Sequence, residues 1–229
     1  MHEVWINTEL YSNTELFWYL GGFAIWGLSY VYVVRNAFRY RYVEIPAMAV
    51  CGNITWELLW GFFWTVDMGR LLQWMYRGGC LLDVGILLML WRYGDKQVAS
   101  PALRKILRPS IVFALLAWLP TWWFMRAMGY DLPLGSNSAY VINVVMSVLC
   151  LQLVFTTADA KLLSLEVAWT KGLGTGFVTV FCFLKYDNPF TLTLGVICAI
   201  LDTVYTVLLW RRLRGTWQPE GAIPQAARA

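Results

Sequence analysis

The most informative part of the sequence is Cys51-Gly52-Asn53-Ile54-Thr55-Trp56-Glu57-Leu58-Leu59-Trp60, which lies inside an apolar run from about Tyr42 to Thr65. A run of this length can cross a bilayer as a helix. A carboxyl group therefore lies near the middle of a predicted membrane span. Placing an acidic side chain there costs about 2.5–3.5 kcal/mol, so Glu57 is expected to face the interior of a helix bundle and to have a function.

One face of this predicted helix carries an amide, an acid and two indoles. They belong to Asn53, Glu57, Trp60 and Trp64, which fall at positions i, i+4, i+7 and i+11. Two interpretations remain open at this point. The face is either a polar clamp between membrane helices or one wall of a reactive cavity.

The whole chain has the composition of a membrane protein. Of its 229 residues, 59 % are hydrophobic and only 14 % are charged, whereas about 25 % of residues are charged in ordinary soluble domains. Seven apolar segments of spanning length follow one another, at about 17–35, 42–65, 72–91, 110–127, 139–156, 166–184 and 190–210. We therefore expect an all-α bundle of seven transmembrane helices, forming a single domain over residues 1–229 with a disordered tail from about residue 215. Such a multi-pass protein would lie in a bacterial plasma membrane or in the endoplasmic reticulum.

The basic residues predict the orientation of these spans. Lysines and arginines gather after the first, third, fifth and seventh spans, as Arg35, Arg39, Arg41, Arg92, Lys96, Arg104, Lys105, Arg108, Lys161, Arg211, Arg212, Arg214 and Arg228. Because cytoplasmic loops are enriched in these residues, the N-terminus is expected outside or in the lumen and the C-terminus in the cytoplasm. The net charge of +4 comes from these loops, which suit lipid headgroups rather than nucleic acid.

Several kinds of chemistry are excluded by the residues that the sequence lacks. The only histidine is His2, and the five cysteines lie within predicted spans without a CxxC pair or the spacing of zinc ligands, so they are expected to pack. The sequence has no DDxxD or DxDD cluster, no G-x-S-x-G motif and no P-loop. We therefore expect neither a metal nor an organic cofactor.

Two further acids, Asp83 and Asp202, lie near the middle of the third and seventh spans. Three carboxyls on three helices could meet in one cavity, where the charged form is disfavoured and at least one acid is neutral. A neutral carboxylic acid in an apolar pocket is a proton donor. Asp83 could instead pair with Arg77 or line the substrate site. Tyr205 lies close to Asp202 on the same face and could hydrogen-bond to it or to a ligand.

The aromatic content suits a cationic intermediate. The chain contains 14 tryptophans and 12 tyrosines, and a cation over an indole face gains roughly 0.5–2 kcal/mol when water is excluded. Aromatic belts at the two membrane surfaces account for many of these residues. Trp56, Trp60 and Trp64 surround Glu57 in the sequence and are the best candidates for the cavity.

These motifs resemble those of the integral-membrane terpene cyclases of fungal meroterpenoid and indole-diterpene biosynthesis, the paspaline-cyclase type, which also has bacterial relatives. The stretch from Cys51 to Glu57 is similar to the family's C-x-N-x-x-W-E, and Asp202-Thr203-Val204-Tyr205 is similar to its D-x-x-Y. A weaker likeness, W-x-[RK]-x-x-G, covers Trp169 to Gly174. The chain departs from the family at Trp122 and Trp123, where a histidine is expected, and at Asp83, where an uncharged polar residue is expected.

The resemblance implies a metal-independent cyclase that protonates the terminal alkene or epoxide of a prenyl chain attached to an aromatic or heterocyclic acceptor. Glu57 would be the proton donor and Asp202 its partner, with the exchange of these roles left open. The remaining site residues would bind substrate: Asn53, Trp56, Trp60, Trp64, Asp83 and Tyr205. The implied partners are this hydrophobic substrate, membrane lipids, and an upstream prenyltransferase and epoxidase.

The alternative interpretation is a small seven-helix transporter that uses its intramembrane acids as a proton relay. Such proteins often contain internal repeats, and spans one to three show no similarity to spans five to seven. A retinal-type photoreceptor would need a lysine in the middle of the last span, which has none. The sequence therefore favours the cyclase.

Overall fold

The computed structural model describes residues 4–98 and 100–219, and within these ranges all regular structure is helical. Seven α-helices follow in order: α1 (Asn13–Tyr40), α2 (Ala47–Leu58), α3 (Arg70–Tyr93), α4 (Pro101–Ala127), α5 (Ser136–Thr156), α6 (Leu165–Tyr186) and α7 (Pro189–Leu213). A π-helical turn, η1 (Leu59–Phe63), continues α2, and two 3₁₀ turns, η2 (Gly94–Gln97) and η3 (Ala160–Leu162), lie in connections. The predicted all-α fold class is confirmed.

Five helical segments in the described part of the chain are long and apolar enough to cross a membrane: Asn13–Tyr40, Arg70–Gln97, Ser136–Thr156, Leu165–Tyr186 and Pro189–Leu213. The other two α-helices, α2 and α4, are not among them, and α2 has only 12 residues. The count of seven crossings stays a prediction.

Two predicted boundaries differ from the observed ones. The second helix does not fill the apolar run from Tyr42 to Thr65, because Tyr42–Ile45 form a buried connection before Pro46, the N-cap of α2. The fourth helix begins at Pro101 and not at about residue 110, where the fourth apolar segment was predicted to begin. Proline is favoured at the first position of a helix, and α4 continues through Pro109 and Pro120 to Ala127.

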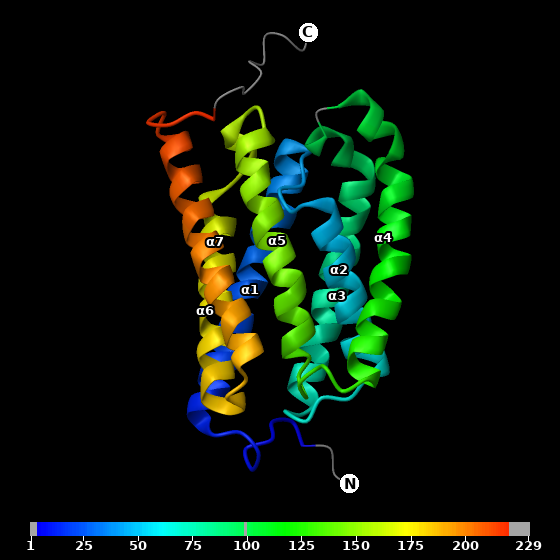
Figure 1. The fold of residues 1–229 in the computed structure, drawn as a ribbon, viewed down its shortest axis with the longest axis vertical. Coiled ribbons are helices and arrows are strands. Elements are labelled where there is room, and N and C mark those ends of the chain that lie inside the picture. The colour runs from blue at the N-terminus through cyan, green and yellow to red at the C-terminus, as the bar shows by residue number, and fades with distance from the viewer. Residues whose placement is uncertain (1–3, 99, 220–229) are drawn as a thin grey trace.

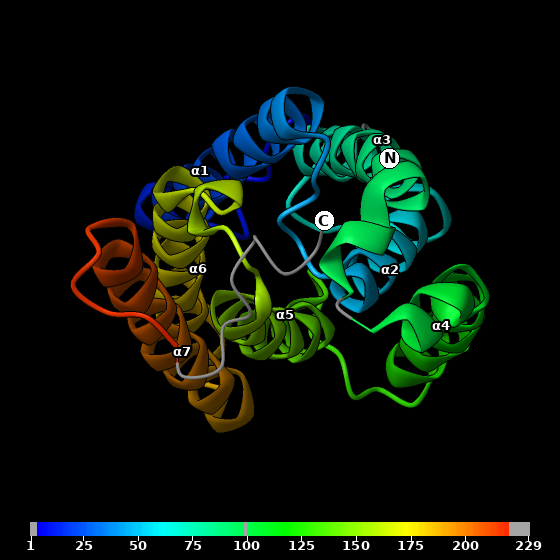
Figure 2. The same cartoon turned by 90° about the horizontal axis from the view of Figure 1, so that it is seen from above.

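The helices stand side by side and alternate in direction along the chain (Figure 1). Helices α1, α3, α5 and α7 run the same way, so the basic residues in the last turns of α1, α3 and α7 gather at one end of the bundle (Figure 1). Viewed along the bundle, α1, α3, α2, α5 and α6 form a ring, with α4 outside α2 and α7 outside α5 and α6 (Figure 2). All five cysteines are buried and free, as expected of packing residues.

Glycines set how closely α1 approaches α6. A β-carbon at Gly22 would lie 2.9 Å from the carbonyl oxygen of Gly174 and 2.8 Å from Val178. A β-carbon at Gly174 would in turn lie 2.7 Å from Trp26. The two helices can therefore pack at this distance only because both positions lack a side chain.

The end of the chain packs on the bundle as far as the structure describes it. Trp217 lies edge-on to Phe155, with ring centroids 5.5 Å apart. The remainder of the tail expected from residue 215, residues 220–229, lies outside the described residues.

Candidate active site

A cavity of about 330 Å³ lies inside the ring of five helices and is open at one side. Its walls come from α1, α2, α3, α5 and α6, and most of the lining atoms are apolar. Seven aromatic side chains contribute to the walls: Tyr19, Phe23, Trp26, Tyr30, Trp56, Tyr76 and Tyr140. The volume falls within the range of about 300–1,000 Å³ that is usual for small-molecule sites.

Glu57 lines this cavity from α2. Its side chain is 5 % exposed, and its Oε1 accepts a hydrogen bond of 3.2 Å from the hydroxyl of Tyr30. Its Oε2 is buried and has no hydrogen-bond partner. Gly79 of α3 makes room for this carboxyl, because a β-carbon there would lie 2.5 Å from Oε1. Glu57 therefore lines an apolar cavity and keeps one buried carboxyl oxygen without a hydrogen-bond partner.

Asn53 joins Glu57 to the second buried acid, Asp83. Its Nδ2 donates to the Tyr30 hydroxyl at 2.5 Å and to Asp83 Oδ2 at 2.7 Å. Asp83 is 2 % exposed and is not among the residues that line the cavity. Arg77, the alternative partner for Asp83, instead donates from Nε to the carbonyl oxygen of Gly61 at 2.8 Å.

Tyr30 is a functional candidate that the sequence did not reveal. It lies on α1, 27 positions before Glu57, and belongs to no motif. Because tyrosines are common in membrane helices, the position of Tyr30 in the sequence does not mark it as functional. Only the packing of α1 against α2 and α3 shows that it bridges Glu57 and Asn53.

Trp56 is the one member of the predicted tryptophan group that lines the cavity. Its Nε1 donates to Ser138 Oγ at 2.7 Å, and Ser138 Oγ donates to Asp131 in the connection between α4 and α5. Burial raises the pKa of the Asp131 carboxyl, although four hydrogen bonds oppose this effect. The rings of Trp56 and Tyr76 meet edge to face, with their centroids 5.0 Å apart. This chain of contacts holds an indole beside Glu57.

Trp60 and Trp64 do not line the cavity, so the prediction of one regular helical face is wrong beyond Leu58. From Leu59 the backbone forms a π-helical turn, in which the N–H of Trp64 bonds to the carbonyl of Leu59. Such a turn uses i to i+5 bonds and rotates later side chains away from the α-helical positions. Trp60 is fully buried below the Arg126 guanidinium, 4.4 Å from its ring centroid.

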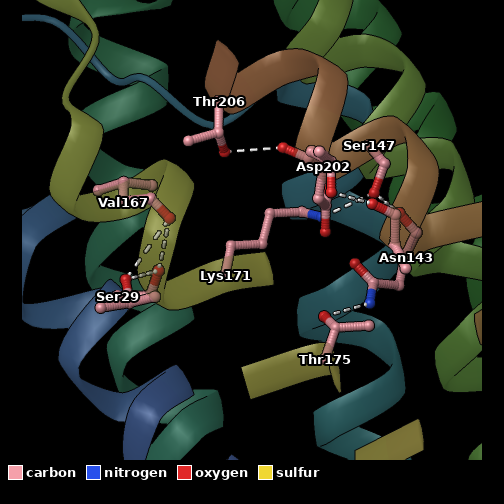
Figure 3. A network of polar contacts seen from close by, with 11 residues as sticks. Ser29, Asn143, Ser147, Val167, Lys171, Thr175, Asp202 and Thr206 are labelled. Carbon is pink, nitrogen blue, oxygen red and sulfur yellow. Dashed lines mark hydrogen bonds and ion pairs between the residues drawn. The ribbon is translucent and has the colours of Figure 1, made fainter. Parts of the chain in front are cut away.

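Asp202 is paired with a lysine on a neighbouring helix. Its Oδ1 and Oδ2 accept hydrogen bonds of 2.6 and 2.7 Å from Lys171 Nζ of α6, and both side chains are 3 % exposed (Figure 3). Asp202 does not line the cavity that holds Glu57. It lines a separate hollow on the α6 and α7 side. The structure therefore brings Glu57 and Asp83 together but leaves Asp202 apart.

A row of polar side chains connects the Lys171–Asp202 pair to the cavity wall. Lys171 Nζ also donates to Ser147 Oγ at 2.6 Å, and Ser147 donates to the carbonyl oxygen of Asn143 at 2.9 Å (Figure 3). Asn143 Nδ2 donates to Thr175 Oγ1 at 2.8 Å, and both of these residues line the cavity. The Asn143 Oδ1 atom is buried without a partner.

The motifs did not predict the contacts of Lys171 or the surroundings of Tyr205. Lys171 stands in the weaker motif without an assigned role, although a lysine inside an apolar span is itself a signal of function. Tyr205 is 1 % exposed and packs in the buried cluster with Tyr42 and Val154. It is not among the residues that line the cavity.

The arrangement supplies an acid and aromatic faces. Among residues 4–98 and 100–219, no group of three or more His, Cys, Asp or Glu side chains is placed to hold a metal ion. The carboxyl of Glu57 can give a proton to a molecule in the cavity, and the surrounding rings can stabilise a cation.

Comparison with known proteins gives a family match over most of the chain. The model of the Pyr4-like transmembrane terpene cyclases matches residues 9–214, a segment that contains Glu57, Asp83 and Asp202. The chain is 20 % identical over 165 residues to the Pyr4-family terpene cyclase mfmH of Annulohypoxylon moriforme, covering 71 % of this chain and 67 % of that protein. It is 26 % identical over 167 residues to the terpene cyclase macJ of Penicillium terrestre, covering 69 % and 62 %.

A third relative is aligned over more of its length. The terpene cyclase cle7 of Aspergillus versicolor is 19 % identical over 198 residues, or 81 % of each chain. The chain thus spans about two thirds of the first two relatives and four fifths of the third. No solved structure matches it.

Proposed function

Because the chain belongs to the Pyr4-like transmembrane terpene cyclases, we propose that it cyclises a prenyl chain attached to an aromatic or heterocyclic acceptor, with Glu57 as the proton donor. The observation that carries this assignment is that Glu57 lines an aromatic cavity and that its buried Oε2 has no hydrogen-bond partner. Relatives named as terpene cyclases support the class of reaction. The assignment of an aromatic or heterocyclic acceptor is based on the resemblance of the sequence motifs to those of the family.

The reaction begins when Glu57 transfers its proton to the terminal alkene carbon or to the epoxide oxygen. A carboxylate remains on the enzyme, and a cation forms at the more substituted carbon, where the π bond of the alkene is used or the C–O bond of the protonated epoxide breaks. Neighbouring double bonds then close rings by attacking this cation in turn. Loss of a proton from the last cation restores the neutral acid and gives a product isomeric with the substrate.

The walls of the cavity suit the cation. Trp56, Trp26 and Tyr76 present rings to it, and each favourable ring face contributes about 0.5–2 kcal/mol to a desolvated cation. Tyr30 donates to the Glu57 carboxyl and is itself held by Asn53. These contacts orient the acid and stabilise the carboxylate that forms when the proton leaves.

We assign Asp202 a positioning role. It holds Lys171, which donates to Ser147 behind the cavity-lining Asn143. Through this row Asp202 supports the wall on the α5 and α6 side without touching the substrate. This assignment differs from the role implied by the resemblance, in which Asp202 is the partner of the proton donor Glu57.

The chemistry of the substrate also implies its supply. A prenyltransferase must attach the chain to its acceptor, and an epoxidase must act first if the epoxide is the form that is protonated. An apolar substrate of this kind partitions into lipid, which suits an enzyme whose site lies among membrane helices. The membrane is that of a bacterial cell or of the endoplasmic reticulum.

The first test is product analysis of membranes that contain the wild-type protein or the Glu57→Gln variant. Linear farnesylated and geranylgeranylated indoles, with and without a terminal epoxide, are the substrates, and mass spectrometry and NMR identify the products. We expect the wild type to form a cyclic product of unchanged mass. Glu57→Gln keeps the shape of the side chain but removes the acid, so the rate should fall by about 100-fold or more.

The matched control is Glu9→Gln, which changes an exposed carboxylate outside the cavity. It should cyclise the substrates at the wild-type rate. Full activity in Glu57→Gln would overturn the assignment of the donor. If folded wild-type protein returns every substrate unchanged, pH-dependent transport in liposomes would test the acids as a proton pathway.

A further inference from the structure

The cavity reaches the outer surface of the bundle between α1 and α3. Phe23 and Gly27 of α1 and Gly78 and Leu82 of α3 all line it. Gly78 is exposed, and Leu82 is 39 % exposed although it is part of the cavity wall. The side of the cavity formed by these residues is therefore open.

Two polar contacts mark the ends of this opening. Toward one end of the bundle, the hydroxyls of Tyr19 and Tyr76 form a hydrogen bond of 2.6 Å that joins α1 to α3. Toward the other end, Tyr30 of α1 is linked through Asn53 to Asp83 of α3. Gly27 lies between the two α1 residues in sequence, and Gly78 lies between the two α3 residues.

The glycines show that the two helices are apart between these contacts. A β-carbon at Gly27 or at Gly78 would meet no atom within 4 Å. On the other side of α1, a β-carbon at Gly22 would lie 2.9 Å from the Gly174 carbonyl oxygen of α6. Helix α1 is thus closely packed against α6 and open toward α3.

The opening lies beside the reacting acid. Gly79, next to Gly78, is the residue against which the Glu57 carboxyl packs. Leu81, which precedes the rim residue Leu82, is 69 % exposed on the outer surface of the same helix. This surface is apolar and, in a membrane helix, meets acyl chains.

From this geometry we infer that the prenyl substrate enters the cavity sideways from the bilayer, between α1 and α3, and that Gly27 and Gly78 set the width of the entrance. The inference rests on the proposed function, since it takes a prenyl chain as the ligand. An apolar chain that passes directly from lipid to an apolar cavity never has to be exposed to water. With such an entrance, the prenyl chain can lie in the cavity while the bulky acceptor stays at the opening.

The test narrows the entrance without touching the acid. Gly27→Leu and Gly78→Leu each place a side chain in the open space, and Gly27→Ala and Gly78→Ala form a graded pair. Gly85→Leu is the matched control, because a β-carbon there also meets no atom within 4 Å but Gly85 does not line the cavity. Replacing glycine within a helix does not by itself destabilise it, and thermal unfolding in detergent checks each variant.

We expect kcat/KM for the farnesylated indole to fall by about 10-fold or more in the leucine variants and by less than about twofold in the alanine variants and Gly85→Leu, with kcat at saturation little changed. This split follows when bound substrate reacts faster than it leaves, because association then limits kcat/KM, whereas a narrowed entrance does not change the chemical step that sets kcat. Folded leucine variants with the wild-type kcat/KM would overturn the inference.

A second measurement separates this inference from the proposed reaction. The association rate of the farnesylated indole is followed by tryptophan fluorescence in the Glu57→Gln protein, with and without Gly78→Leu. Slower association in the double variant supports the entrance even if no cyclisation is found in the wild type. Equal rates, or no binding of this compound, would overturn the entrance, whereas failure of cyclisation alone would overturn only the proposed reaction.

Discussion

At the scale of single residues, the carboxyl of Glu57 is notable for how few hydrogen-bond donors surround it. Its Oε2 has no partner, and the one hydrogen bond to Oε1 comes from a neutral hydroxyl. A buried carboxylate without a cation or several donors is costly. By contrast, Asp202 has a lysine ammonium 2.6 Å away. The two acids that the motifs pair therefore occupy opposite electrostatic surroundings.

The Lys171–Asp202 pair leads to a prediction for stability. Lys171→Met should lower the free energy of unfolding by about 3–5 kcal/mol, because it leaves a buried carboxylate without its partner. Asp202→Asn should also destabilise the protein by leaving the ammonium unpaired. The double variant should be more stable than either single one, since it buries no charge at this position. Thermal unfolding of purified protein measures all three.

Activity of the same double variant tests the role of Asp202. If Asp202 acts only by holding Lys171 and the cavity wall, the double variant should regain part of the activity lost in the single variants. If Asp202 exchanges protons with the substrate or with Glu57, the double variant should be as inactive as Asp202→Asn. Single variants as stable as the wild type would contradict the structural role.

At the scale of elements, the end of α2 decides which side chains reach the cavity. The α-helix holds Asn53, Trp56 and Glu57 on the wall, and the π-helical turn from Leu59 directs Trp60 away from it. π-Helical turns within helices are frequent at functional sites. Here the turn ends the part of the helix that lines the cavity, and the turn itself packs against α3 and α4, as α2 does.

A buried acid also joins elements at the end of the bundle where the basic residues gather. Glu44 lies in the connection between α1 and α2 and is 1 % exposed. It accepts hydrogen bonds from Asn36 of α1 at 2.8 Å and from the backbone N–H of Ser164, the N-cap of α6, at 2.7 Å. Burial raises the pKa of its carboxyl from 4.5 to about 7.

This pKa predicts how stability changes with pH. Because the folded state holds the Glu44 proton more tightly than the unfolded state does, the free energy of unfolding should fall as the pH rises from about 4.5 to 7. A shift of this size corresponds to about 3 kcal/mol. Above pH 7 both states are ionised and the effect is constant.

The measurement compares thermal unfolding of the wild type and Glu44→Gln in detergent between pH 4.5 and 8. The wild type should lose stability relative to Glu44→Gln across this range, because glutamine does not titrate. Glu9→Gln, at an exposed position, should run parallel to the wild type. A constant difference between wild type and Glu44→Gln at every pH would contradict the prediction.

At the scale of the whole molecule, the five ring helices and the two outer helices have different structural roles. The ring encloses the cavity, α4 supports α2, and α7 supplies Asp202 from behind α5 and α6 (Figure 2). Trp122 of α4 shows this support, since its Nε1 donates to the Gly52 carbonyl oxygen of α2 at 3.0 Å. The outer helices thus help to fix the positions of the ring helices, whose side chains line the cavity.

The distribution of basic residues predicts the orientation of this bundle in the membrane. A green fluorescent protein fused to the C-terminus in a bacterial host should fluoresce, and alkaline phosphatase fused there should be inactive, because the basic end is expected in the cytoplasm. Phosphatase fused after Gly129, between α4 and α5, should be active. The reverse pattern would contradict seven crossings with the N-terminus outside.

From the sequence alone follow the helical class, the approximate position of each helix and the burial of the three mid-span acids Glu57, Asp83 and Asp202. These follow from the length and hydrophobicity of local segments, since a bilayer requires long apolar helices and excludes isolated charges. The sequence also singled out Asn53 and Glu57, which a regular helix places on one face, and Trp56, which adjoins Glu57 in the sequence.

Only the tertiary structure decided which acids share a site. Tyr30 reaches Glu57, and Lys171 reaches Asp202, across gaps of 27 and 31 positions that no local periodicity encodes. Likewise, the helical period could not foresee the π-helical turn that removes Trp60 from the cavity. Contacts between helices depend on how whole elements pack against one another, and this packing is a property of the entire bundle rather than of any single segment.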